Sequence, residues 1–367
     1  MKTDREKIYS LQVIRAIAFI GIFTSHCGTS ELGAWGVSVF LVLSGFLMVY
    51  SYYNKTIVDV NYKNCLKFGI KKLKKLYPLH IVTLIGALIL IIIGLIRNFS
   101  VKRIAEIVIQ TLLNISLLQS WIPFESYYFS LNSVAWYLSV CLFLYISFPK
   151  ILIKIKKLSN IQLVTILTIT YILQVIIAFF AGNVIYISNM ALKWLTYICP
   201  MYRLGDFLIG CSIGAIFVRK DRWRINSICA TIVEIMSICI MIICNYIYAV
   251  QSGLLGSEYI RYSTLYTPST VIFILIFAIN KGYVSKVLTC KLLVYIGNIS
   301  AYAFLIHQLV IRYMVIGLHL ILKTELTPWI MTCFSFVITI GCTEIWKKIE
   351  KLSYSATNKK QTEICRL

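Results

Sequence analysis

Charged residues are scarce in this 367-residue chain, and acidic residues are the scarcest, with 14 Asp and Glu against 36 Lys and Arg. Only 14% of residues are charged and 59% are hydrophobic. Soluble domains average about 25% charged residues. An intrinsically disordered chain, a nucleic-acid-binding domain and a disulfide scaffold are therefore all poor fits. With a mean hydropathy of +0.82, the chain is predicted to be an integral membrane protein.

The twelve cysteines show no metal-binding or disulfide pattern. No CxxC pair and no Cys/His cluster with zinc spacing occurs. Most of the cysteines lie inside apolar runs, where cysteine behaves as a small hydrophobic residue. We expect neither a structural metal nor a permanently bound cofactor. No internal repeat and no large polar segment is present, so the function is expected within a membrane bundle or at its two faces.

Ten apolar runs of roughly 20 residues predict an all-α bundle of membrane-spanning helices. The runs begin near Ile8, Gly36, Leu79, Ser133, Ile161, Pro200, Ile228, Thr267, Leu292 and Pro328. An eleventh run, residues 104–120, carries Glu106, Gln110 and Asn114 four residues apart, so these side chains share one helix face. We interpret it as an amphipathic or re-entrant helix. The alternative is an eleventh span.

The distribution of positive charge favours ten spans with both termini in the cytoplasm. In that topology the inside segments hold 27 of the 36 Lys and Arg residues. These segments are residues 1–7, 54–77, 150–157, 219–225, 281–291 and 347–367. If the run at 104–120 crossed the membrane, the basic loops would be divided between the two sides, against the positive-inside rule.

Two ionisable residues interrupt the first predicted span. Arg15 and His26 are eleven residues apart, which corresponds to about 16.5 Å along a helix. Eleven steps of about 100° bring both side chains to nearly the same helix face. Ionisable side chains inside a membrane cost free energy and therefore indicate a functional site. The alternative is that Arg15 extends to the inner headgroups and His26 lies at the outer interface.

Several motifs in a fixed order resemble the acyltransferase-3 family of integral membrane acyltransferases, over residues Ile8 to Trp346. The most specific is Arg15 with His26, which matches the family's R-x10-H. The others are Gly36 to Phe46, the Lys71–Pro78 segment, Trp136–Ser139, Tyr202–Gly210 and Tyr295–His307. Two features depart from the family pattern. Cys141 stands where the family often has glutamate, and lysines precede Tyr77-Pro78 where arginines are common.

The resemblance implies a membrane O-acyltransferase, with residues 1–350 as its membrane domain and 351–367 as a cytoplasmic tail. It implies transfer of an acyl group, by default acetyl, from cytoplasmic acyl-CoA to a hydroxyl of an extracytoplasmic or membrane-linked glycan. His26 is then expected to act as general base or, alternatively, as transient acyl carrier. Arg15 is expected to hold the pantetheine arm or to polarise the thioester carbonyl. A plasma membrane location is expected, without a nucleic-acid partner.

Other candidate residues have both a functional and a structural interpretation. For the phosphates of acyl-CoA the candidates are Lys71, Lys72, Lys74, Lys75 and Tyr77; plain topology or attraction to anionic lipids would also explain the lysines. For the acceptor, or for support of His26, they are Arg203, Asp206, His307 and Trp136. Arg203 and Asp206 are alternatively a structural ion pair, and His307 a hydrogen-bonded histidine of the bundle. Gly210 and Gly214 predict a close helix contact.

Two rival functions remain open on the sequence. A polytopic transporter or exporter of a polysaccharide precursor or small metabolite would also have about ten spans and buried charges. However, the matched, interrupted helices of inverted-repeat transporters are not visible here. An acyltransferase that acts on a lipid, a peptidoglycan sugar or a small molecule would differ only in its outer loops.

Overall fold

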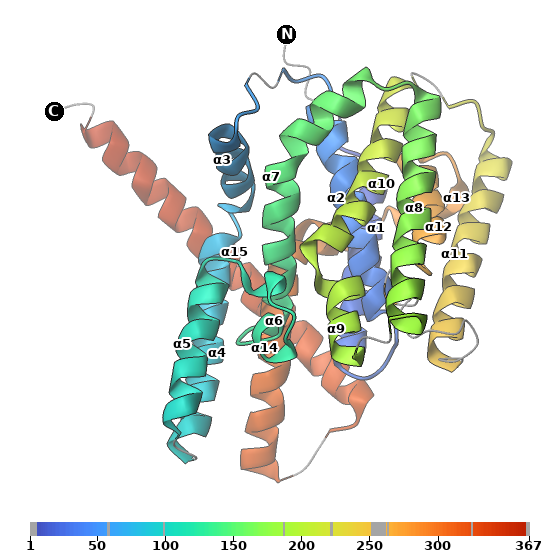
Figure 1. Ribbon diagram of the computed structural model, residues 1–367. Helices are drawn as coiled ribbons and strands as arrows, with labels where there is room; N and C mark the ends of the chain where they lie inside the picture. The colour runs from blue at the N-terminus through green and yellow to red at the C-terminus, as the bar shows by residue number, and fades with distance from the viewer. Residues whose placement is uncertain are drawn as a thin grey trace.

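The computed structural model describes residues 6–56, 59–97, 100–185, 188–220, 223–250, 262, 264–323 and 326–364. Within these residues the secondary structure is helical, which confirms the predicted fold class. The α-helices, shown in Figure 1, are α1 (Tyr9–His26), α2 (Gly33–Tyr52), α3 (Tyr62–Leu73), α4 (Tyr77–Arg97), α5 (Val101–Ile115), α6 (Glu125–Tyr128), α7 (Trp136–Lys157), α8 (Asn160–Asn183), α9 (Asn189–Lys193), α10 (Pro200–Arg219), α11 (Ser227–Val250), α12 (Thr267–Ile279), α13 (Tyr283–Leu288), α14 (Lys291–Leu322) and α15 (Pro328–Ile364). Short 3-10 helices at Gln119–Trp121 and Ser133–Ala135 and a π-helix at Trp194–Ile198 connect them.

Eight helical segments of the described chain are long and apolar enough to cross a membrane. They are α2, α4, α7, α8, α9 with α10, α11, α14 and α15. Together with α1, which carries Arg15 and His26, and the shorter apolar helix α12, they correspond to the ten predicted runs. The chain is thus a polytopic helical membrane protein.

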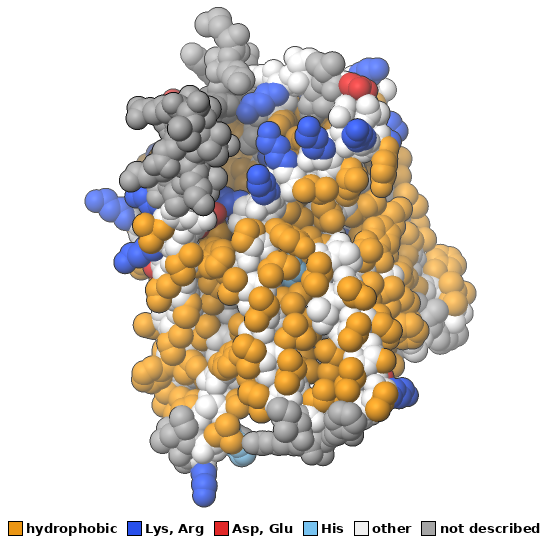
Figure 2. Space-filling view, turned by 90° about the vertical axis from the view of Figure 1, so that its left-hand side faces the viewer, with side chains coloured by type: hydrophobic (Ala, Val, Ile, Leu, Met, Phe, Trp, Pro, Cys, Tyr) orange, Lys and Arg blue, Asp and Glu red, His pale blue; other side chains and the backbone are white. Residues whose placement is uncertain are grey.

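The surface has the polarity expected of a membrane protein. Large apolar side chains face outward, for example Ile161, which is 80% exposed, and Val337, which is 70% exposed. Figure 2 shows an apolar belt with Lys and Arg side chains gathered at its upper end, the end at which Figure 1 places both chain termini. This arrangement is that of the positive-inside rule, with the basic end toward the cytoplasm.

The predicted amphipathic run corresponds to α5 and the irregular segment that follows it. α5 ends at Ile115, five residues before the predicted boundary, and lies beside α4 (Figure 1). Its polar side chains bond the next segment, since Gln110 donates to the Ser126 carbonyl at 2.9 Å and Asn114 donates to Ser130 Oγ at 2.8 Å. Glu106 instead pairs with Arg103 at 3.0 Å. The polar stripe therefore serves to hold an irregular loop against the helix.

Glycines bring the central helices into close contact. A Cβ at Gly210 would collide with the Val42 carbonyl oxygen, and one at Gly214 would lie 2.9 Å from the Phe46 carbonyl oxygen. Both contacts join α10 to α2, which confirms the close helix contact that the glycine spacing predicted and identifies its partner. A Cβ at Gly297 would likewise collide with the Gln12 carbonyl oxygen, which joins α14 to α1. These close approaches set the positions of the helices that carry the candidate site.

Replacing Gly210 with alanine is expected to destabilise the protein by about 1–3 kcal/mol, the usual cost of overpacking. The colliding atom belongs to the backbone and moves only if α2 moves. Gly317→Ala is the matched control, because nothing lies within 4 Å of a Cβ at that position and alanine is the better helix former. Thermal unfolding in detergent compares the two variants. Equal midpoints would contradict the close packing of α2 and α10.

Candidate active site

The two histidines that the sequence singles out lie together in the structure. His26 is the last residue of α1, and His307 lies near the middle of α14. His26 Nδ1 and His307 Nε2 are 2.7 Å apart, and the two rings are within 8° of parallel. His307 is wholly buried, whereas His26 is exposed. The structure therefore presents one accessible imidazole that is held from behind by a second.

The hydrogen-bonding partners assign the protons of this pair. His307 Nδ1 lies 2.7 Å from the Phe304 carbonyl oxygen. A carbonyl oxygen only accepts, so His307 Nδ1 carries a proton that it donates. In a neutral His307 the Nε2 atom is then an acceptor, and His26 Nδ1–H donates to it. His26 Nε2 is left with a free lone pair, which is the condition for a general base.

Short contacts hold the end of α1 in place without covering His26. Thr29 Oγ1 lies 3.3 Å from Thr332 Oγ1, and Cys27 Sγ lies 3.7 Å from Ser335 Oγ, so both join the chain after α1 to α15. Thr24 Oγ1 lies 2.7 Å from Ser30 Oγ and closes the turn. These bonds fix the position of the His26 backbone, and the imidazole remains open to an acceptor.

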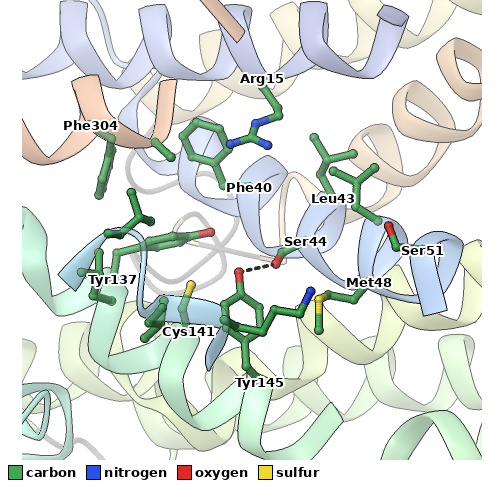
Figure 3. Close-up of a pocket in the computed structure, with 16 residues that line it drawn as sticks. Arg15, Phe40, Leu43, Ser44, Met48, Ser51, Tyr137, Cys141, Tyr145 and Phe304 are labelled. Carbon is green, nitrogen blue, oxygen red and sulfur yellow. Dashed lines mark hydrogen bonds between the residues drawn. The ribbon is translucent and has the colours of Figure 1, made fainter. Parts of the chain in front are cut away.

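Arg15 lines a cavity of about 310 Å³ between α1, α2, α3, α7 and α14. Figure 3 shows its guanidinium across the cavity from the hydroxyls of Tyr137, Ser44 and Tyr145. Ser44 Oγ and Tyr145 Oη are 3.0 Å apart. No described residue forms a hydrogen bond or ion pair with the Arg15 guanidinium. A cation with unused donors in a partly polar cavity is suited to a ligand rich in acceptor oxygens.

The cavity extends from the basic end of the bundle toward its middle. Ser51, near the inner end of α2, and Lys72 of α3 line one end. Phe40, Tyr137 and Phe304 line the other end. Phe40 and Ser51 are eleven residues apart on one helix, so the cavity spans about 16.5 Å of depth. It therefore runs along α2, and Phe304, at its deep end within the bundle, contacts His307.

The helix α7 supplies most of the polar cavity side chains that sequence reasoning left without a role. Tyr137, Cys141 and Tyr145 recur every four residues and so lie on one helix face. This spacing is readable in the sequence and predicts a polar face on α7. The lack of a glutamate at Cys141 does not remove that face, because the cavity lining on α7 is built from hydroxyls and a thiol.

Of the lysines predicted to bind acyl-CoA, Lys72 lines the cavity. Its Nζ lies over the ring of Tyr52, 4.2 Å from the ring centroid. Lys71, Lys74 and Lys75 are exposed on the same side of the bundle but outside the cavity lining. Tyr77 is elsewhere, since its hydroxyl donates to the Ile115 carbonyl and joins α4 to α5. The structure therefore places Lys72 at the cavity and leaves Lys71, Lys74, Lys75 and Tyr77 outside its lining.

Arg203 and Asp206 form the predicted ion pair, with Arg203 Nη1 2.7 Å from Asp206 Oδ2. Both side chains are wholly buried, and the guanidinium also lies 5.5 Å from the centroid of the Tyr197 ring. Trp136 packs against the same tyrosine, with its ring 5.1 Å from that of Tyr197. Arg203, Asp206 and Trp136 all lie outside the lining of the Arg15 cavity. Their burial favours the structural interpretation over an acceptor-binding wall.

Among the described residues, no group of His, Cys, Asp and Glu side chains is arranged to hold a metal ion. The site itself presents an imidazole pair, a guanidinium and several hydroxyls.

The chain matches the acyltransferase-3 family, described as an acyltransferase domain, over residues 8–345. The protein therefore belongs to this family, as the order of its motifs predicted. It is also similar to acyltransferase MdmB of Streptomyces mycarofaciens, with 25% identity over 240 residues. The alignment covers 59% of this chain and 59% of that relative. No solved structure matches the chain.

Proposed function

We propose that this protein is a plasma-membrane O-acyltransferase that transfers an acyl group, by default acetyl, from cytoplasmic acyl-CoA to a hydroxyl of an extracytoplasmic or membrane-linked glycan. The observation that carries the proposal is the hydrogen-bonded pair of His26 and His307. It supports a general base at the end of the helix whose inner half carries Arg15. Membership of the acyltransferase-3 family supports the class of reaction.

His26 Nε2 takes the proton of the acceptor hydroxyl as the hydroxyl oxygen attacks the carbonyl carbon of the thioester. The new carbon–oxygen bond forms, the carbon–sulfur bond breaks, and the CoA thiolate leaves and recovers the proton from His26. While His26 is an imidazolium, its Nδ1–H continues to donate to His307 Nε2. His307 thus holds the ring in one orientation and stabilises the charge, a role that a carboxylate has in hydrolytic triads.

The distance along α1 means that Arg15 and His26 have different roles. The two residues are about 16.5 Å apart along the helix axis, and both side chains lean toward its N-terminus. Two hydrogen bonds in series span only about 6 Å. Arg15 therefore does not polarise the carbonyl that a His26-bound hydroxyl attacks. Its proposed duty is to hold an acceptor group of the CoA arm, such as an amide carbonyl, while the thioester extends toward His26.

The basic mouth of the cavity supports binding of the CoA phosphates. Lys72 lines the cavity, and Lys71, Lys74 and Lys75, its neighbours in the sequence, are exposed. Lysines bind phosphate groups as mobile point charges, which suits a flexible ligand entering from the cytoplasm.

The proposal is tested with purified protein in nanodiscs and acetyl-CoA radiolabelled in the acetyl group. Thioester loss and transfer of label to a crude surface-glycan fraction are both followed. We expect label to appear in the glycan in an alkali-labile ester, with one CoA thiol released for each acetyl transferred. If the protein neither binds nor consumes acetyl-, propionyl- or succinyl-CoA, the acyltransferase proposal is wrong and transport of a glycan precursor becomes the hypothesis to test.

A further inference from the structure

Phe304 belongs to both parts of the candidate site. Its side chain is 5% exposed and lines the Arg15 cavity. Its ring centroid lies 5.6 Å from that of His307, and its carbonyl oxygen accepts the hydrogen bond from His307 Nδ1. The cavity and the histidine pair are thus separated at this point by a single aromatic ring.

Two more rings close the deep end of the cavity around Phe304. The Phe304 ring lies 6.2 Å from Phe40, at an interplanar angle of 82°, and 5.4 Å from Tyr137, at 64°. Phe40 and Tyr137 are themselves 6.3 Å apart. The three rings come from α2, α14 and α7, and each contacts the other two. They form a partition, defined by Phe40, Tyr137 and Phe304, between the cavity and His307.

A donor held by Arg15 reaches His26 only if its acyl end passes this partition. The cavity runs along α2 from Ser51 to Phe40, and the lining residue Phe304 contacts His307. The remaining separation from Arg15 to His26 is too long for hydrogen bonds to bridge. The CoA phosphates stay at the basic mouth, so the acyl group leads the donor into the cavity and is the part that meets the rings.

We propose that Phe304 is a positioning residue that determines acyl-group size, because its ring borders the passage between the Arg15 cavity and His26. This inference rests on the proposed acyl-CoA-dependent transfer. A ring at that point leaves room for a small acyl group and obstructs each further methylene. Hydrophobic pockets that discriminate by one methylene commonly do so by about 10–200-fold.

The test compares transfer from acetyl-, propionyl- and butyryl-CoA by wild type and Phe304→Leu. We expect the leucine variant to raise the butyryl-to-acetyl ratio of kcat/KM by about tenfold or more. Phe304→Trp is expected to lower the propionyl-to-acetyl ratio. The matched control is Phe23→Leu, since Phe23 is fully buried and its ring lies 5.8 Å from that of His307, but it does not line the cavity. A lost packing contact beside His307 would lower all donors alike in this control.

The two Phe304 variants are expected to change the preference for longer acyl groups in opposite directions. Either variant that folds therefore tests the role of Phe304. Ratios that stay at the wild-type value in a folded Phe304 variant overturn the inference. So does a Phe23→Leu protein that shows the same change of ratio. If wild type uses no acyl-CoA at all, the proposed function itself fails and this inference fails with it. If wild type is active but the variants keep the wild-type ratios, the role of Phe304 is wrong and the proposed function stands.

Discussion

Replacing His26 with alanine is expected to lower acyl transfer by about 10²–10⁴-fold, the usual contribution of a positioned general base. The acceptor hydroxyl would then attack without a group to take its proton. Binding of acyl-CoA is expected to remain within about twofold of wild type, because His26 lies beyond the cavity that Arg15 lines. Transfer of label and equilibrium binding of acyl-CoA are both measured on the purified protein.

The partner histidine offers a graded comparison. His307→Ala removes the acceptor for His26 Nδ1–H. A hydrogen bond to a charged group is worth about 1.5–3 kcal/mol, so a loss of about 10–150-fold is expected. His307→Gln keeps an acceptor oxygen and is expected to recover part of that activity. Transfer that survives in folded His26→Ala but is lost in both His307 variants would move the base from His26 to His307.

Replacing Arg15 with methionine is expected to change activity and stability in opposite directions. The kcat/KM for acyl-CoA should fall by about 10–150-fold, mainly through KM, since charge-assisted hydrogen bonds to the donor are worth about 1.5–3 kcal/mol. The thermal midpoint should equal or exceed that of wild type. A cation within a membrane span costs about 2.5–3.5 kcal/mol on insertion scales, and no described residue forms a hydrogen bond or ion pair with Arg15 to offset that cost.

Arg15→Lys separates charge from geometry, because lysine keeps the charge and loses the planar fork of donors. An intermediate KM is expected for this variant. Steady-state kinetics and thermal unfolding in the same detergent measure both quantities. If the midpoint of Arg15→Met falls together with its activity, the role of Arg15 is structural and the donor-binding assignment is wrong.

The fold class could be read from the sequence because membrane insertion depends on local properties. Each span needs about 20 apolar residues, and each basic loop favours one side. Both signals lie within short stretches of chain, so ten spans and an amphipathic helix near residues 104–120 were predictable. The end of α5 was not, because Gln110 and Asn114 bond the segment that follows the helix, and that segment has no periodicity of its own.

The candidate site was predictable as far as helix periodicity extends. Arg15 and His26 share a face of one helix, and eleven residues determine their separation. The same argument applied to Tyr137, Cys141 and Tyr145 would have found the polar face of α7. Four neighbouring lysines look alike in the sequence, yet Lys72 alone among them lines the cavity. α3 packs through Cys65, Gly69 and Leu73, and this packing sets its rotation.

The sequence by itself determined the class of protein, the spans, their orientation and the two ionisable residues of α1, since each follows from composition or from the period of a single helix. Only the tertiary structure decided that His26 bonds His307, 281 residues away, and that Phe304 separates this pair from the Arg15 cavity. These contacts depend on how closely α1, α2, α7 and α14 approach one another. That approach is set by packing at points such as Gly297 against Gln12, where no local pattern identifies the partner helix.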